Sequence, residues 1–235
     1  DTARAFSINT KEAIEAVKQR YPKLPLMVGN VDCPEGAKAL IDWGADIVKV
    51  GIGPGEACRT REAGIGTPQL SAIAKCAAVA KMDTAAASTS NGPLPYTKAI
   101  VADGGMKSSG DICKALAAGA DAVMSGSLFI GAIESAAEDY LNRQGLRIKE
   151  YIGSASFKAQ QERVRHGTLD NSRRPEGVAQ EMPVLGTMKE VVEDLLSGMR
   201  STMSYLGVTS VEELRLKGRF ELQTQAGLFE GTKRK

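Results

Sequence analysis

The sequence is poor in the residues that build metal sites. It contains one histidine, His166, and its four cysteines (Cys33, Cys58, Cys76 and Cys113) show no CxxC spacing. Zinc sites need clustered cysteine and histidine ligands, so this scarcity argues against one. Few and scattered cysteines in a chain of 235 residues are typical of a reducing compartment. We therefore expect free thiols and a cytoplasmic protein.

Long apolar runs and an excess of one charge are also missing. No stretch approaches the roughly 20 apolar residues of a membrane span, and residues 1–4 show no charged-then-apolar leader. We expect neither a membrane partner nor a targeting segment. The 30 basic residues are matched by 28 acidic ones, which leaves a formal net charge of +2. Such a balance gives no case for nucleic-acid binding.

Short apolar runs alternate with amphipathic segments over residues 1–135. The runs predict strands at residues 24–29, 45–50, 99–102 and 121–124, and the segments between them predict helices at 34–43, 69–81 and 111–118. Pro68 suits a first helical position. Strands that alternate with helices of this length predict an α/β fold with a parallel sheet.

The pattern changes in the rest of the chain. Residues 82–96 are small and rich in Pro, Gly and Ser, which predicts a surface loop. Residues 138–186 contain one strand candidate, at 146–152, and then a polar stretch, which is typical of a flap-like excursion without further regular structure. Apolar residues at helical spacing predict a helix at 187–205, and a shorter helix follows at 210–217.

Polar and glycine residues follow each predicted strand of the parallel sheet. They are Asn30, the glycine-rich residues 51–55, Asp103 with Gly104 and Gly105, and Gly126 with Ser127. Because the carboxyl ends of parallel strands share one edge, we expect these residues to line a common mouth. The glycine turns favour a phosphate site, although they could also serve only to make tight turns.

Cys58 is the strongest candidate for chemistry. It follows the glycine-rich loop and is flanked by Arg59 and Arg61, which would favour its thiolate. A thiolate at the carboxyl end of a strand is a candidate nucleophile. The alternative is a buried, inert cysteine, which we expect for the other three. His166 lies in the polar stretch and is more typical of a solvated histidine than of a catalytic partner.

Around Cys58, Arg59, Thr60 and Arg61 the chain resembles the cysteine loop of the IMP dehydrogenase and GMP reductase family. Similar motifs recur in the family's order at residues 1–3, 29–31, 103–105, 109–111, 124–127, 176–177 and 200–202. The resemblance implies a (β/α)8 TIM barrel, of which the chain would supply the C-terminal half, about strands 4–8, the flap and the C-terminal helices. It also implies a single catalytic domain over residues 1–235, with the N-terminal strands missing and no CBS domain.

The same resemblance implies purine-nucleotide oxidoreductase chemistry, in which Cys58 attacks carbon 2 of the base. Segments 127–135, 149–156 and 200–205 are similar to GMP reductase, which uses NADPH to convert GMP to IMP. Segment 107–111 is closer to IMP dehydrogenase, which oxidises IMP with NAD. The dehydrogenase needs a flap Arg-Tyr pair, and the nearest candidate, Arg163, has no tyrosine beside it. We favour the reductase, and an impaired nucleotide-binding paralogue stays open.

The resemblance also implies roles for individual residues. Thr60 and Glu176 would handle protons, and Asp103 would hold the ribose. Gly105, Gly126 and Ser127 would hold the 5′-phosphate of a purine nucleoside monophosphate, with Asn30, Gly104, Tyr151 and Gly153 as further substrate contacts. Asp1, Ala3 and Ser7 would lie along the nicotinamide cofactor. Carbonyls of Gly53, Gly55 and Cys58 would hold a monovalent cation such as K⁺, and the assembly would be a homotetramer.

Three departures from the family pattern stand out. Glu56 replaces a common serine, and its carboxylate would repel a phosphate unless Arg59 or another cation screens it. Arg4 and Ala5 replace a polar-glycine pair near the nicotinamide, and Ser154 replaces a methionine beside the base. These departures leave open an altered ligand.

Overall fold

The computed structural model of the chain describes residues 2–87, 98–153, 156, 161 and 177–231. Four parallel strands form its central sheet in the order β1-β2-β3-β4: β1 (Met27–Val31), β2 (Ile47–Val50), β3 (Ala99–Asp103) and β4 (Ala122–Met124). Each strand pairs with the next one along the chain. This arrangement confirms the predicted α/β fold with a parallel sheet, and all four predicted strands are present.

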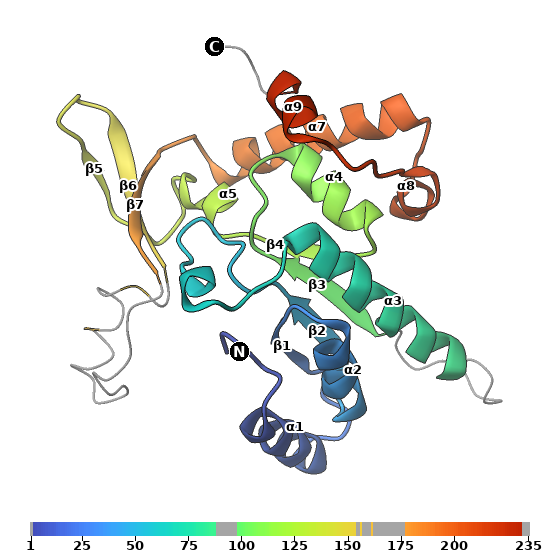
Figure 1. Cartoon of the computed structure of the whole chain (residues 1–235). Coiled ribbons are helices and arrows are strands. Elements are labelled where there is room, and N and C mark those ends of the chain that lie inside the picture. The colour runs from blue at the N-terminus through green and yellow to red at the C-terminus, as the bar shows by residue number, and fades with distance from the viewer. Residues whose placement is uncertain (1, 88–97, 154–155, 157–160, 162–176, 232–235) are drawn as a thin grey trace.

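Helices cover one side of this sheet (Figure 1). They are α2 (Pro34–Asp42), α3 (Gln69–Ala87) and α4 (Ser109–Ala117). Their inner faces and the strands build one core, with Leu40, Val48, Ile73 and Ile100 almost completely buried. Pro34 starts α2, where its missing N–H costs nothing. The predicted helices here are confirmed.

Two expectations for the first half of the chain need correction. The predicted loop at 82–96 is wrong at its start, because α3 continues to Ala87 on helix-favouring alanines; residues 88–97 lie outside the described part. The prediction also omitted α1 (Ile8–Arg20), which has only one buried residue, Ile14, and therefore a weak apolar pattern. The Ser7 hydroxyl accepts from Thr10 N–H and caps this helix.

A second, antiparallel sheet lies away from the first (Figure 1). It contains β5 (Asp139–Leu141), β6 (Arg147–Ile152) and β7 (Ala179–Pro183). The strand predicted at 146–152 is confirmed as β6. The expectation that residues 138–186 hold no further regular structure is wrong, because β5 and β7 pair with β6. Both missed strands are short and largely exposed, so they carry little apolar signal.

Four more described helices follow β4. They are α5 (Ser127–Ile130), α7 (Met188–Leu206), α8 (Val211–Lys217) and α9 (Gln225–Glu230); α7 and α8 pack on α4, and α5 packs on α7 and β6. A capping box between Thr187 and Glu190 starts α7, and Gly207 in the left-handed region ends it. The helices predicted at 187–205 and 210–217 are confirmed as α7 and α8. Among the described helices, none is long and apolar enough to cross a membrane.

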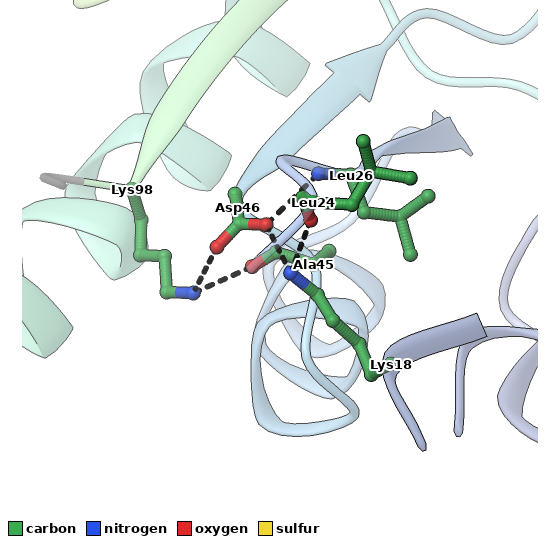
Figure 2. A network of polar contacts seen from close by, with 6 residues as sticks. All are labelled: Lys18, Leu24, Leu26, Ala45, Asp46 and Lys98. Atoms are coloured by element: carbon green, nitrogen blue, oxygen red, sulfur yellow. Dashed lines mark hydrogen bonds and ion pairs between the residues drawn. The ribbon is translucent and has the colours of Figure 1, made fainter. Parts of the chain in front are cut away.

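An ionic network closes the amino end of the sheet, opposite the mouth (Figure 2). Asp46, just before β2, accepts hydrogen bonds from Lys18 and from the backbone N–H of Leu26, and it pairs with Lys98. Burial opposes the charge of Asp46, but these hydrogen bonds and the two lysine charges outweigh it and lower the pKa of the carboxyl. The network connects α1, through Lys18, to the starts of β2 and β3, which Asp46 and Lys98 precede.

Candidate functional site

A cavity of about 410 Å³ opens at the carboxyl ends of the four parallel strands. It is lined by most of the predicted site residues: Ala3, Asn30, Gly53, Gly55, Cys58, Thr60, Asp103, Gly104, Gly105, Gly126, Ser127, Tyr151 and Gly153. The structure therefore brings together residues that are up to 150 positions apart in sequence. Parallel strands account for this, since each one delivers its last residues to the same edge.

Cys58 lies in this cavity with a hydroxyl beside its sulfur. Its Sγ is 3.2 Å from Oγ1 of Thr60, and Thr60 begins the short 3₁₀ helix η1 (Thr60–Ala63) and is almost fully buried. The Cys58 side chain is half-buried, whereas Cys76 and Cys113 are buried as expected. Cys33 is only partly buried, which corrects the expectation that it is in the core. The loop thus presents a thiol and a hydroxyl as a pair.

The two arginines beside Cys58 are engaged elsewhere. Arg59 forms an ion pair with Glu62, and Arg61 donates to the carbonyl of Thr67. The stem of Arg61 covers Gly53, where an added Cβ would come within 2.5 Å of it and where φ is +79°. Arg61 therefore supports the glycine loop. The contacts of the two arginines are with Glu62 and Thr67, so they do not support the prediction that these arginines stabilise a Cys58 thiolate.

Asp103 sits at the end of β3 and receives two donors from neighbouring strands. The amide of Asn30 lies 3.0 Å and the ammonium of Lys49 2.8 Å from the same oxygen, Oδ2. Asn30 also donates to the carbonyl of Gly51 at 2.7 Å. Sequence reasoning missed Lys49, which lines the cavity although only 8% of it is exposed. The available signal was a charged residue inside a strand that is otherwise buried.

The loop that bears Cys58 is held close to the end of β3. A Cβ on Gly51 would lie 2.1 Å from the carbonyl oxygen of Asp103, so only glycine fits there. Gln69 at the start of α3 donates to the carbonyls of both Val50 and Asp103. This side chain fixes β2 against β3 at the level of the cavity and was not predicted from the sequence.

Tyr151 reaches the glycine turn after β4. A Cβ on Gly126 would lie 2.5 Å from the Tyr151 hydroxyl, which shows how close the phenol comes to this backbone. Burial, followed by the negative charges of Asp103, Glu56 and Cys58, raises the pKa of Tyr151. The phenol therefore stays protonated at neutral pH, and it can donate a hydrogen bond to a ligand.

The end of β6 and the residues just before β7 form part of the cavity wall. The carbonyl of Ala57 accepts from the N–H of Val178, and the carbonyl of Glu56 accepts from the amide of Gln180. Gly177 pairs with Cys58 as an isolated bridge and lines the cavity. Ser125, Thr2 and Gly177 are further lining residues that were not predicted as site residues.

Some predicted residues lie elsewhere. Ser7 is the exposed cap of α1 and is not among the cavity-lining residues. Asp1, Glu176, Ser154 and His166 lie outside the described residues, so their predicted roles stay predictions. Within the described part, no group of three or more His, Cys, Asp or Glu side chains is arranged to hold a metal ion.

Known proteins resemble this chain over its whole length. A family model described as "IMP dehydrogenase / GMP reductase domain" matches residues 1–234. The chain is 43% identical to inosine-5′-monophosphate dehydrogenase of Chlorobaculum parvum over 240 residues and 44% identical to that of Chlorobaculum tepidum over 239. Each alignment covers 98% of this chain but 46% of the relative, so the chain spans about half the length of these proteins.

A solved structure shows the same arrangement. GMP reductase of Trypanosoma brucei, in a structure with guanosine 5′-monophosphate, superposes with a TM-score of 0.87 and 36% identity. The superposition covers 100% of this chain and 46% of that one. Together with the matched family model, this likeness leads to one conclusion: the chain belongs to the IMP dehydrogenase and GMP reductase family.

Proposed function

We propose that the protein is an NADPH-dependent GMP reductase that acts through a covalent bond to Cys58. The observation that carries this proposal is the Cys58 thiol, which lies in a cavity at the strand ends with the Thr60 hydroxyl 3.2 Å from its sulfur. A paired hydroxyl and thiol can exchange a proton while the sulfur attacks. The family and its GMP-bound structural neighbour support a purine nucleotide as the ligand.

The reaction balances as two displacements at carbon 2 of guanine. The Cys58 thiolate forms a bond to this carbon, and the bond to the exocyclic amine breaks. The amine takes up protons and leaves as ammonia, and Thr60 and Glu176 are proposed to relay these protons. Carbon 2 would then accept a hydride as the carbon–sulfur bond breaks and the electron pair of that bond returns to Cys58. NADPH, if bound beside Cys58, would supply this hydride and become NADP⁺, so that the products are IMP, ammonia, NADP⁺ and the restored thiolate.

The cavity wall offers contacts for each part of the nucleotide. Asp103 would accept hydrogen bonds from the ribose hydroxyls. Gly105, Gly126 and Ser127 would offer backbone N–H groups to the 5′-phosphate, and the neutral Tyr151 phenol would add a donor. The remaining proposed contacts are Asn30, Gly104 and Gly153, which all line the same cavity.

The residues present are compatible with a nicotinamide cofactor and a monovalent cation. Ala3 is exposed at the cavity and leaves room for a flat ring, and Asp1 and Ser7 are proposed to extend this side. The bound nicotinamide would supply the hydride. Gly53, Gly55 and Cys58 all line the cavity, and neutral carbonyl oxygens suit K⁺ better than a divalent ion.

A second candidate is the NAD-dependent oxidation of IMP to XMP, which the names of the curated relatives favour. A third is a nucleotide-binding protein without turnover. Glu56 favours this third candidate, because it lines the cavity and its carboxylate would repel a phosphate. Arg59, the cation expected to screen it, pairs with Glu62 instead. The three candidates predict different results in two assays, NADPH oxidation with GMP and NAD reduction with IMP.

We further propose that β1–β4 are the fifth to eighth strands of a (β/α)8 barrel. Two findings support this: the strands are all parallel and lie in chain order, and the superposition on GMP reductase is close. Sequential order is typical of a barrel and differs from doubly wound sheets, in which the order reverses. A cytoplasmic homotetramer is proposed on the family resemblance.

The deciding experiment follows nicotinamide absorbance with the full-length protein. We expect NADPH consumption with GMP, and none by a Cys58→Ala variant that still binds GMP. Cys33→Ala serves as the matched control, because Cys33 is also partly exposed but does not line the cavity. NAD reduction with IMP would select the dehydrogenase instead. Nucleotide binding without turnover of either substrate would contradict both enzymes.

A further inference from the structure

Lys49 is a buried cation in the floor of the cavity. Its residue is 8% exposed, and its Nζ lies 2.8 Å from Oδ2 of Asp103 and 3.8 Å from the sulfur of Met124. A buried lysine is costly unless its charge is paired. Its place among cavity-lining residues suggests that the charge serves the ligand site as well as the fold.

Strand register explains how the side chain reaches this position. Lys49 on β2 pairs with Val101 on β3, and Asp103 lies two residues beyond Val101, so both side chains project from the same face. On the other side Lys49 pairs with Gly29 of β1. A Cβ on Gly29 would lie 2.4 Å from the Cβ of Lys49. The glycine therefore makes room for the lysine stem.

The donors around Asp103 converge on one of its two oxygens. Lys49 and Asn30 both donate to Oδ2, from the strands β2 and β1. Their donation from two directions fixes the plane of the carboxylate, and neither of these two donors uses Oδ1. Two hydroxyl groups on adjacent carbons are a ligand that a fixed carboxylate can recognise.

We propose that Lys49 is a positioning residue for the recognition of ribose by Asp103. With Asn30, it holds the carboxylate oriented so that Asp103 accepts hydrogen bonds from the vicinal hydroxyls of a bound nucleotide. Lys49 acts through Asp103 and gives the site its preference for ribose over deoxyribose. This inference rests on the proposed function and deepens it by assigning the sugar preference to a specific side chain.

The test compares the binding of GMP and 2′-deoxy-GMP by calorimetry, using the full-length protein. We expect the wild type to prefer GMP by about tenfold or more, since a hydrogen bond to a charged group is of that strength. In Lys49→Met this preference should fall to below about threefold, while affinity for 2′-deoxy-GMP changes little. Lys98→Met is the matched control, because Lys98 is another partly buried lysine that pairs with an aspartate at the opposite end of the sheet.

A double-mutant cycle on GMP affinity distinguishes a positioning role from a purely structural one, because a structural loss would add to the loss from Asp103→Asn. If Lys49 acts through Asp103, Lys49→Met should add little to the loss caused by Asp103→Asn. Circular dichroism checks the fold, and Lys49→Gln replaces the methionine variant if that variant does not fold. Equal losses of affinity for GMP and 2′-deoxy-GMP, or an unchanged preference for GMP in the folded Lys49 variant, would overturn this inference and leave the proposed function standing. A wild type that binds neither nucleotide would overturn the proposed function, and this inference with it.

Discussion

Exposure distinguishes Cys58 from the buried cysteines of the chain. Burial, with smaller effects from Cys33, Asp32 and Glu35, raises the pKa of Cys76 to about 12. At pH 8 we therefore expect iodoacetamide to modify the partly exposed Cys58 and Cys33, with Cys76 left intact. Peptide mass spectrometry of the native protein would measure this order.

Nucleotide protection makes the alkylation result specific to the site. Saturating GMP should slow the modification of Cys58 and leave Cys33 unchanged, since only Cys58 lines the cavity. Rapid modification of Cys76 in the folded protein would contradict the structure. Equal protection of Cys33 and Cys58 would instead indicate a general tightening of the fold.

The hydroxyl next to the Cys58 sulfur gives a second prediction at the scale of single residues. Thr60→Val keeps the shape of this buried side chain and removes the oxygen 3.2 Å from Sγ. We expect kcat to fall about 10- to 100-fold with little change in KM, as for the loss of a proton-transfer group. Steady-state kinetics would measure both constants. Thr67→Val is the control, because its hydroxyl donates to Asp32 nearby; an equal effect there would contradict a specific role for Thr60.

Close packing at Gly126 gives a third prediction. Gly126→Ala would place a methyl group 2.5 Å from the Tyr151 hydroxyl, so the end of the phenol must move. We expect affinity for GMP to fall about tenfold or more, with little loss of stability, because only the tip of one side chain is displaced. Gly110→Ala is the control, since its new methyl would meet its nearest atom at 3.6 Å. Unchanged GMP affinity in Gly126→Ala would remove Tyr151 from the site.

The site residues divide by whether a sequence pattern could reveal them. Cys58, Asp103 and Gly126 were predictable because each lies at the end of a strand or in the loop that follows it, and strand ends meet in a parallel sheet. The charge of Lys49 inside a buried strand was a signal in the sequence, but its contact with Asp103 and the role of Gln69 depend on which strands are neighbours and on a register that only tertiary structure fixes. The ion pair of Arg59 with Glu62 is local, three residues along the chain, and it depends on the 3₁₀ turn of η1, which the prediction did not include.

Among the elements, the ionic network at the amino end of the sheet gives a stability prediction. Asp46→Asn should lower the free energy of unfolding by about 1 to 3 kcal/mol at pH 7, because Lys18 and Lys98 lose a charged acceptor. Urea unfolding would measure it. The comparison variant is Asp42→Asn, which breaks an exposed pair with Lys38 within one helix and should cost below about 0.5 kcal/mol.

The pH dependence of this difference follows from the lowered pKa of Asp46. A carboxyl whose pKa is lower in the folded state stabilises the fold above its unfolded pKa, about 4, and loses this effect as the pH falls through the folded value. The gap between wild type and Asp46→Asn should therefore be full above about pH 5 and shrink below about pH 4. A gap that stays constant down to pH 3 would contradict the network.

Elements with one buried face were predictable, and those without one were not. The parallel strands and α2, α4 and α7 carry apolar residues at clear spacing, and caps mark several of their ends. In contrast, α1 buries only Ile14, and β5 is exposed throughout. Such elements form because tertiary partners complete them, as β6 does for β5 and β7. Local sequence contains little of that information.

In the molecule as a whole, the C-terminal helices close over the end of the parallel sheet. Arg215 on α8 donates to the carbonyls of Leu116 and Ala120 and pairs with Asp121, which precedes β4. One side chain thereby connects α8, the end of α4 and the start of a central strand. The three acceptors are 94 to 99 residues away in sequence, so no local pattern indicates this connection.

Arg215→Met tests whether the C-terminal helices and the sheet unfold together. The methionine keeps the apolar stem and removes one hydrogen-bond donor from each of two carbonyls and from Asp121, so we expect a loss of about 1 to 3 kcal/mol. Arg219→Met is the control, because the described hydrogen bonds of Arg219 go to carbonyls of its own segment, at Leu216 and Gly218. If one cooperative unit exists, urea transitions followed by Trp43 fluorescence and by circular dichroism should coincide and shift together in the variant. Transitions that separate, with Trp43 unaffected, would show that the C-terminal helices unfold independently of the sheet that builds the site.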